Sequence, residues 1–343
     1  MLAVLEPSVG AKSPQERLLE GVVGGVRAKP SPQEGEHDVT VLEVEALEGR
    51  DRDHCLHILS NAARPASVRV RAMKIAVVGH VEWVEFARVE QMPRGGDIVH
   101  AWETWAQAGG GGAVAALQLL RLAGDATLFT ALGDDELGRR ARDELVGAGL
   151  TVYVSHGGEP QRRAFCHVDE SGERTITVLG EKLRPRGEDG DLPWEELARA
   201  DAVYFVSGDT AALRQARRAR VLVATARELA TLKAGAVELE ALVGSGDDDG
   251  ERYHPGDLEP PPKLVVSTAG ALGGWAQPGG PYTAAAPQGD VEDAYGCGDC
   301  FAAGLTFGLA RGDEIADALA LGARCGAGAL TGRGVHAAAV ELG

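Results

Sequence analysis

The sequence predicts an α/β protein with three α/β/α layers: a doubly wound, mostly parallel sheet that carries a small β-lid. Three observations support this fold class. From Met73 onward, short apolar runs alternate with amphipathic helical segments, which is the pattern of a parallel sheet. Early in this region, two stretches of alternating apolar and polar residues interrupt the pattern. Near the C-terminus, a glycine-rich turn at 296–298 leads directly into a long helix rich in alanine and glycine.

The elements of this region are expected in a defined order. Strands are predicted at 74–80, 126–133, 200–208, 220–226, 239–245 and 263–270. Helices are predicted at 111–124, 135–149, 300–310 and 313–329. Gly124 and Gly149 should end the first two helices, because glycine adopts the left-handed conformation that helix ends often require.

The two interrupting stretches, at about 85–108 and 163–180, alternate apolar and polar residues as half-buried strands do. Within the second, the sequence DESGER at 169–174 is typical of a hairpin turn. We expect the stretches to form a small flap beside the main domain, where such a lid commonly covers a substrate.

Residues 1–72 precede this domain and are expected to be an accessory or poorly ordered extension. They are rich in proline, glycine and charge; a strand is conceivable at 38–47 and a short helix at 52–63. No chemistry is assigned to them. The working domain is therefore predicted to be 73–343.

Composition restricts the partners. The formal net charge of −17 disfavours nucleic acid or an anionic membrane as the main partner, because phosphate backbones require a basic face. The sequence contains no apolar run of 18 residues that could span a membrane, and the N-terminus lacks the pattern of a secretory signal. Five cysteines, an odd number, favour reduced thiols and a cytoplasmic location.

Four common nucleotide, hydrolase and redox motifs are absent from the sequence or weakly matched. No Gly-Lys dipeptide occurs, which excludes a Walker A loop, and no G-x-S-x-G supports a hydrolase. The run GGGAVA at 110–115 fits a relaxed dinucleotide fingerprint, but the stretch before it is a poor buried strand. Cys297 and Cys300 form a Cys-x-x-Cys pair, yet they lie far from the first strand of the domain and lack close metal-ligand partners.

The glycine turn supplies a second interpretation of this pair. Gly296 and Gly298 allow a tight turn whose successive N–H groups point at one spot at the start of a helix, a preferred place for phosphate. Asp299, in the first helical turn, is aimed at the same spot. A carboxylate beside a bound phosphate can act as a base for an attacking hydroxyl, or can simply stabilise its helix.

Three segments in order settle between these interpretations. DAYGCGDCFAAG at 293–304, the glycine-rich helix start and G-D-D of 106–138, and VVSTAGALGGW at 265–275 resemble the signatures of the ribokinase family, the PfkB-type carbohydrate kinases. The resemblance covers nearly all of the chain after Met73. It implies a ribokinase-like fold and transfer of the γ-phosphoryl of Mg-ATP to a hydroxyl of a sugar, sugar-like or nucleoside acceptor.

The resemblance also implies roles for individual residues. Asp299 would be the general base, and the backbone N–H groups of Gly296, Cys297 and Gly298 would form an anion hole. ATP would lie against Thr268, Gly270 and Gly273. Asp293, with the region near Gly334, would match a loop pair that binds a monovalent cation such as K⁺. Members of the family often form homodimers through the lid, so a homodimer is plausible here.

The chain departs from the family pattern on the acceptor side. Val114 stands where an asparagine is usual, and the N-x-x-E that organises Mg²⁺ is best matched by Ser245 and Asp248. The acceptor-side candidates are Glu82, Trp83, Gly110 and Gly111. Two alternatives remain open at this point: a non-catalytic, regulatory sugar- or nucleotide-binding member of the fold, and an NAD-dependent Rossmann oxidoreductase.

Overall fold

The computed structural model describes residues 3–5, 40–42 and 73–335. The chain divides into two compact units, residues 1–70 and 71–343. In the first, β1 (Ala3–Leu5) pairs antiparallel with β2 (Thr40–Leu42), which lies within the strand expected at 38–47. The helix expected at 52–63 lies outside the described residues.

The second unit is built on a nine-stranded sheet with the order β15-β14-β13-β12-β11-β10-β3-β6-β7. The seven strands from β13 to β7 are mutually parallel, whereas β14 and β15 add an antiparallel edge. Its strands are β3 (Ile75–Val78), β6 (Thr127–Leu132), β7 (Thr151–His156), β10 (Ala202–Phe205), β11 (Val221–Thr225), β12 (Ala241–Ser245), β13 (Val265–Thr268), β14 (Gly274–Gln277) and β15 (Gly280–Tyr282). All six predicted strands are present; β7, β14 and β15 were not anticipated.

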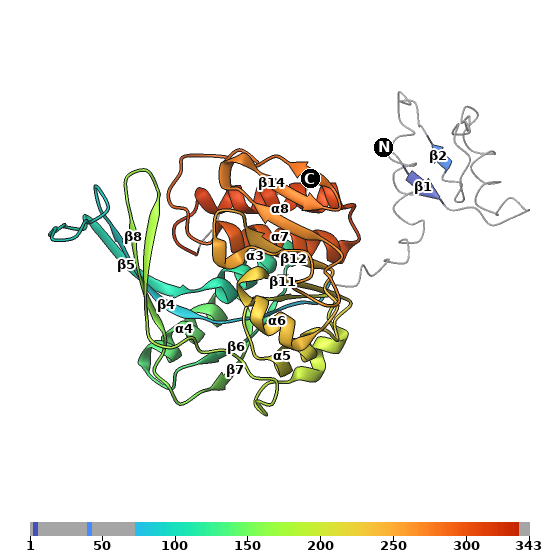
Figure 1. Cartoon of the computed structure of the whole chain (residues 1–343), viewed down its shortest axis with the longest axis horizontal. Coiled ribbons are helices and arrows are strands. Elements are labelled where there is room, and N and C mark those ends of the chain that lie inside the picture. The colour runs from blue at the N-terminus through green and yellow to red at the C-terminus, as the bar shows by residue number, and fades with distance from the viewer. Residues whose placement is uncertain (1–2, 6–39, 43–72, 336–343) are drawn as a thin grey trace, which may run out of the picture. The chain divides into compact units, whose positions relative to one another are not determined.

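Helices cover both faces of this sheet, as the three-layer prediction requires (Figure 1). One buried cluster joins the sheet to α3 (Gly111–Ala123), α4 (Glu136–Gly147), α7 (Cys297–Arg311) and α8 (Ile315–Leu330). A second joins the other face to η1 (Trp194–Arg199), α5 (Thr210–Ala216) and α6 (Leu229–Gly235). Gly124 caps α3 in the left-handed conformation with φ of 77°, as predicted. The short helices η2 (Ala226–Glu228), η3 (Asp249–Glu251) and η4 (Gly270–Leu272) follow β11, β12 and β13.

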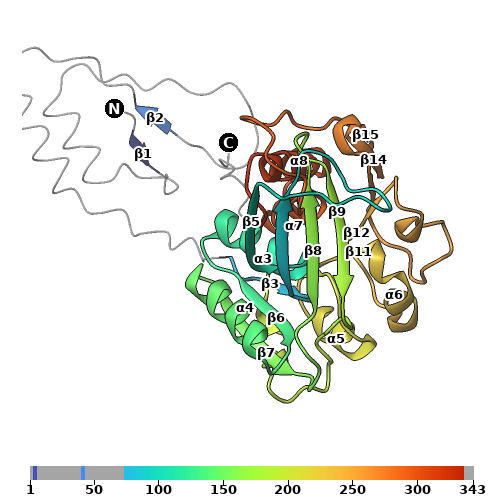
Figure 2. The same cartoon turned by 90° about the vertical axis from the view of Figure 1, so that its left-hand side faces the viewer.

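The lid is a separate four-stranded sheet with the order β5-β4-β8-β9, seen beside the helices in Figure 2. Its strands are β4 (Glu82–Arg88), β5 (Glu103–Gly109), β8 (Arg163–Val168) and β9 (Arg174–Leu179). The lid therefore begins three residues before the predicted boundary, at Glu82. Phe86 stacks on Trp105 at 4.7 Å and meets the ring of Tyr295 edge-on at 5.1 Å. Because Tyr295 belongs to the glycine-turn segment, this contact ties the lid to the candidate site.

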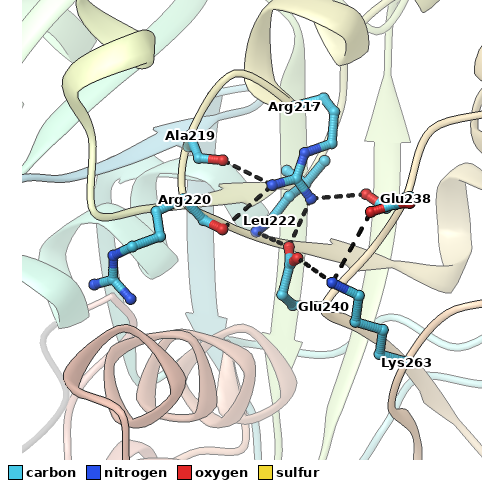
Figure 3. A network of polar contacts seen from close by, with 7 residues as sticks. All are labelled: Arg217, Ala219, Arg220, Leu222, Glu238, Glu240 and Lys263. Carbon is cyan, nitrogen blue, oxygen red and sulfur yellow. Dashed lines mark hydrogen bonds and ion pairs between the residues drawn. The ribbon is translucent and has the colours of Figure 1, made fainter.

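A polar network lies at the amino-terminal ends of the central strands β11 and β12 (Figure 3). The Glu240 carboxylate accepts hydrogen bonds from the backbone N–H of Leu222 at 2.6 Å and from Arg217 and Lys263 at 2.6 and 3.1 Å. Partial burial alone would raise the pKa of Glu240, but these donors together hold it below its ordinary value. The network holds together the amino-terminal ends of these two strands.

Glu240→Gln is expected to destabilise the fold by about 1–3 kcal/mol at pH 7, because it removes charged hydrogen bonds from a partly buried network. The folded-state pKa of Glu240 is lowered, so its stabilising contribution is present above the unfolded value and is lost as pH falls through the folded value. Urea unfolding at pH 7 and pH 4 tests this. The variant and the wild type should converge at low pH, and an equal gap at both values would contradict the assignment.

Candidate active site

The order of the parallel strands places a crevice at one edge of the sheet. The sheet is built outward in two directions from the neighbouring strands β3 and β10, and ligands of such sheets bind outside the carboxyl ends of the strands at this switch point. Gly79 follows β3 and Val206 follows β10, and a Cβ at Gly79 would lie 3.0 Å from Val206 Cβ. The predicted site residues should therefore gather here.

The glycine turn opens α7 at this edge. Gly296 is the N-cap of the helix in the left-handed conformation, with φ of 77°, and the helix begins at Cys297, three residues before the predicted start at 300. A Cβ built at Gly298 would meet no atom within 4 Å, so the side of the first helical turn at Gly298 is open. The first N–H groups of a helix have no partner within it and carry its positive dipole end. This geometry suits an anion.

Asp299 lies in the first turn of α7, half-buried among charged groups. Burial raises the pKa of Asp299 to about 6; Glu251 and Glu82 add to the rise, while Arg227 and Arg174 oppose it. An aspartate with this pKa is ionised at neutral pH yet binds a proton readily. That is the property required of a general base.

The two cysteines of the turn lack the character of a redox pair. Burial raises the pKa of Cys297 to about 11 and that of Cys300 well above its ordinary value. Their thiols are therefore protonated at neutral pH, whereas a reactive Cys-x-x-Cys needs a lowered pKa. The cysteines serve as small residues in the turn.

The glycine pair at the start of α3 faces Asp299. A Cβ at Gly111 would lie 2.8 Å from Asp299 Oδ1 and 2.9 Å from Val206 Cγ1, so this position has room only for hydrogen. Gly110 has φ of 83° and its N–H donates to the Tyr295 hydroxyl at 2.8 Å. Two segments far apart in sequence thus form one wall of the site. The strand before this pair is β5 of the lid, so GGGAVA does not open the helix of a parallel βαβ unit as a dinucleotide fingerprint would.

The side chains of Glu82 and Trp83 lie on different sides of β4, because neighbouring residues on a strand point to opposite faces. Glu82 is 7% exposed, and its Oε1 lies 2.9 Å from Nε of Arg162 and 3.8 Å from Nε2 of His80. A Cβ at Gly110 would lie 3.2 Å from Glu82 Cγ, which places this carboxylate beside the glycine pair. The structure does not bring Trp83 to the site: its ring packs under Arg140 of α4, at 4.5 Å.

The nucleotide-side candidates lie at the carboxyl ends of β12 and β13. Ser245 and Thr268 are register partners, and Gly246 N–H donates to the Thr268 carbonyl at 2.7 Å. Gly270 and Gly273, with φ of 53° and 91°, form the turn into β14. A cavity of about 170 Å³ is lined by Ser245 together with residues of β12, β13 and η3. Thr268, Gly270 and Gly273 are not among the residues that line this cavity.

Two charged residues of this region were missed by sequence reasoning. Glu251 is 8% exposed, and its carboxylate accepts from the Ser245 N–H at 2.9 Å and pairs with Arg227. Arg227 also reaches Asp248, at 3.4 Å. Asp248, predicted to order Mg²⁺, caps η3 through its own hydrogen bond to the Gly250 N–H. Neither missed residue lies in a recognisable local motif, so no sequence signal pointed to them.

Asp293 is fully buried and joins two loops. Its Oδ1 accepts from the Tyr295 N–H at 2.9 Å and its Oδ2 from the Gly334 N–H at 2.7 Å. Burial raises the pKa of Asp293 above its ordinary value, and the two N–H donors, with nearby Arg88 and Arg174, only partly oppose this rise. The predicted proximity of Asp293 to Gly334 is confirmed. No group of three or more His, Cys, Asp or Glu side chains within the described residues could hold a metal ion.

The three-layer fold and the carboxylate in the first turn of α7, beside a glycine pair, suit an enzyme that transfers a phosphoryl group. A sequence profile described as "pfkB family carbohydrate kinase" matches residues 72–341. The chain belongs to the pfkB family of carbohydrate kinases. No helix within the described residues is both long and apolar enough to cross a membrane.

Named relatives agree with this assignment. The ATP-dependent ribose-1-phosphate kinase of Halopiger xanaduensis is 29% identical over 74% of this chain and 91% of its own. The aminoimidazole riboside kinase of Salmonella typhimurium is 28% identical over 67% and 84%. The solved Arabidopsis thaliana ribokinase complexed with ribose and ATP superposes with a TM-score of 0.59 at 18% identity, covering 78% of this chain and 96% of its own. The likeness to that structure supports the ribokinase-like fold, and these relatives are kinases by name.

Proposed function

We propose that this protein transfers the γ-phosphoryl of Mg-ATP to a hydroxyl of a sugar or sugar-like acceptor, with Asp299 as the general base. The observation that carries the proposal is the closeness of the Asp299 carboxylate to the start of α3 at the switch point of the sheet, where a Cβ at Gly111 would lie 2.8 Å from Oδ1. A carboxylate whose pKa burial raises to about 6 thus lies beside the glycine pair, in the first turn of α7, which supports a role as a base.

The chemistry follows from these groups. Asp299 takes the proton of the acceptor hydroxyl as its oxygen forms a bond to the γ-phosphorus, while the bond from that phosphorus to the bridging oxygen of ADP breaks. The N–H groups of Gly296, Cys297 and Gly298 face the phosphoryl oxygens and stabilise their charge. Arg227, whose charge opposes the rise in the pKa of Asp299, would add a cation.

Magnesium would enter with the nucleotide. Mg²⁺ usually binds substrate phosphates, several waters and one or two carboxylates, and Asp248 and Glu251 beside Ser245 fit the carboxylate part. When bound, it neutralises charge on the phosphates. A monovalent cation at the Asp293–Gly334 loop pair is also part of the proposal, although both Asp293 oxygens already accept N–H groups. Activity with K⁺ replaced by an organic cation tests it.

The acceptor class is supported by the relatives, whose printed substrates or ligands all contain a ribose ring: ribose 1-phosphate, an aminoimidazole riboside and ribose. The experiment is ADP release by the full chain with Mg-ATP against a panel of pentoses, hexoses, their phosphates and nucleosides. We expect acceptor-dependent turnover with a subset of the panel. ADP release that is independent of every acceptor would contradict the proposal.

We also propose a cytoplasmic homodimer associated through the lid. The edge strand β9 exposes Ile176, Val178 and Leu179 by 38%, 42% and 43%, an apolar edge of the kind that proteins usually cover. The mass of the full chain in solution tests the association.

A further inference from the structure

The lid makes direct polar contacts with residues 291–295, the segment that leads into the glycine turn at 296–298. Gly172, at the tip of the hairpin between β8 and β9, accepts a hydrogen bond from the Ala294 N–H at 3.0 Å. The fit is close, because a Cβ at Gly172 would lie 2.9 Å from Val291 Cγ1. Ala294 lies two residues before Gly296, the N-cap of α7, so the lid contacts the chain directly before the anion hole.

A mostly buried arginine of the lid adds an ion pair to the same segment. Arg88, the last residue of β4, is 15% exposed, and its Nη2 lies 2.5 Å from Glu292 Oε2. Its Nε lies 3.4 Å from Glu103 of β5, and Glu103 in turn pairs with Arg333 at 2.7 Å. Charges of opposite sign alternate through these four side chains. The lid is therefore joined to the segment by charge as well as by a backbone hydrogen bond.

The hairpin tip has a shape of its own. The Asp169 carboxylate accepts from the N–H groups of Ser171 and Glu173 at 2.9 and 3.1 Å and from the Ser171 hydroxyl at 2.6 Å. Gly172 has φ of 80°, in the left-handed region that favours glycine. Because these bonds lie within the tip, the Gly172 carbonyl moves with the lid as one piece.

The segment also has partners outside the lid. The Glu292 N–H donates to the Leu330 carbonyl at the end of α8, at 2.7 Å, and Asp293 accepts from the Gly334 N–H. These bonds do not involve the lid, so they persist when the lid moves, whereas the bonds to Arg88 and the hairpin tip do not. An open and a closed lid therefore differ in how firmly the approach to the glycine turn is held.

From these contacts we propose that the lid positions the anion hole through a latch, formed by Arg88 and Gly172 of the lid with Glu292 and Ala294 of the segment. The inference rests on the proposed function and adds positioning residues to it. An acceptor that binds under the lid stabilises the closed lid and, through the latch, the phosphate-binding form of the glycine turn. Acceptor and nucleotide should therefore bind cooperatively, and the coupling is the same whichever of them binds first.

The test reverses the charge at Glu292. In Glu292→Lys two cations face each other, and Glu292 is 45% exposed, so the domain should still fold. Glu85→Lys is the matched control, because Glu85 is 38% exposed and pairs with Arg163 at the same 2.5 Å. That pair joins β4 to β8 within the lid and does not reach the segment. Both variants should melt at similar temperatures.

The first readout is the Kd of the non-hydrolysable analogue Mg-AMP-PNP, with and without the best acceptor of the panel. In the wild type and Glu85→Lys the acceptor should lower this Kd by about 5-fold or more, within the usual range of coupling. In Glu292→Lys the Kd should be independent of the acceptor, and kcat with Mg-ATP should fall about 10-fold, part of the loss that follows removal of an anion-hole donor. Equal coupling in all three proteins would overturn the inference.

Hydrogen exchange of the full chain without ligand separates this inference from the proposed function. Peptides covering 291–298 should exchange at least about 5-fold faster in Glu292→Lys than in the wild type, since losing a charged pair shifts a local opening equilibrium by this order. Faster exchange in Glu292→Lys but not Glu85→Lys, with no turnover of any acceptor, would support the latch and contradict the proposed function. Acceptor turnover with equal exchange in all three proteins would overturn the latch and leave the proposed function standing.

Discussion

Asp299→Asn is expected to lower kcat by about 10²- to 10⁴-fold, the range that general-base catalysis contributes. The substitution keeps the size and shape of the side chain and removes only its ability to accept a proton. Because the asparagine amide can still hydrogen-bond the acceptor hydroxyl, KM for ATP and acceptor should change little. Steady-state kinetics with the best acceptor of the panel measure this. A variant with wild-type kcat would remove Asp299 from the mechanism.

The pH profile follows from the same group. Since the pKa of Asp299 is raised to about 6, the fraction of ionised base falls below that pH, and kcat/KM should fall about tenfold per unit below it. Bound nucleotide phosphates would raise the value further, so the inflection in kcat should lie at or above that in kcat/KM. In Asp299→Asn this inflection should disappear from the residual activity. Its persistence would assign the titration to another group.

The melting temperature of Asp299→Asn at two pH values is a control that distinguishes loss of the base from misfolding. A raised folded-state pKa means that the ionised Asp299 destabilises the fold once the pH rises through about 6. Asp299→Asn should therefore melt at a higher temperature than the wild type at pH 8, and at nearly the same temperature at pH 4, where both side chains are neutral. A lower melting temperature at pH 8 would show that the carboxylate has a structural role instead.

The base and its turn could be predicted from sequence because they are local. Gly296, Gly298 and Asp299 lie within four residues, and the conformation that they need follows from the start of one helix. Most of the parallel strands were predicted for the same reason. β7 was missed because Thr151–His156 is an edge strand without an apolar run, and β15 because it is short and contains Gly280 and Pro281.

The charged part of the site could not be predicted, because it is assembled by tertiary structure. Arg227 comes from η2 and Glu251 from the end of η3, and their contact depends on β11 and β12 lying side by side. His80 follows β3 and Arg162 precedes β8, and both lie beside Glu82 of β4 because the lid folds against the main sheet. For Glu82 and Trp83, the sequence indicated the correct strand, but which of the two faces the site depended on the register of β4 against β5 and β8.

Gly111→Ala is expected to lower kcat by about 100-fold without unfolding the protein. The new methyl carbon would lie 2.8 Å from Asp299 Oδ1 and 2.9 Å from Val206 Cγ1, both too close for an ordinary contact. Val206 is buried beside β10, so Asp299 is the neighbour that can move. A displacement of the base approaching 1 Å costs catalysis about this much, because the proton transfer depends on its alignment. The backbone of Gly111 lies in an ordinary helical region, so alanine brings no conformational strain.

Two alanine controls separate this effect from a general loss of glycine. Gly147→Ala in α4 meets no atom within 4 Å and should leave kcat unchanged. Gly298→Ala also meets no atom within 4 Å, and because the proposed anion hole uses its N–H rather than its side-chain space, kcat should fall only a few-fold. Kinetics and melting temperature are measured for all three variants. A Gly111→Ala enzyme as active as Gly147→Ala would mean that the Asp299 carboxylate is not held against the start of α3 during turnover, and the proposed geometry of the base would then be wrong.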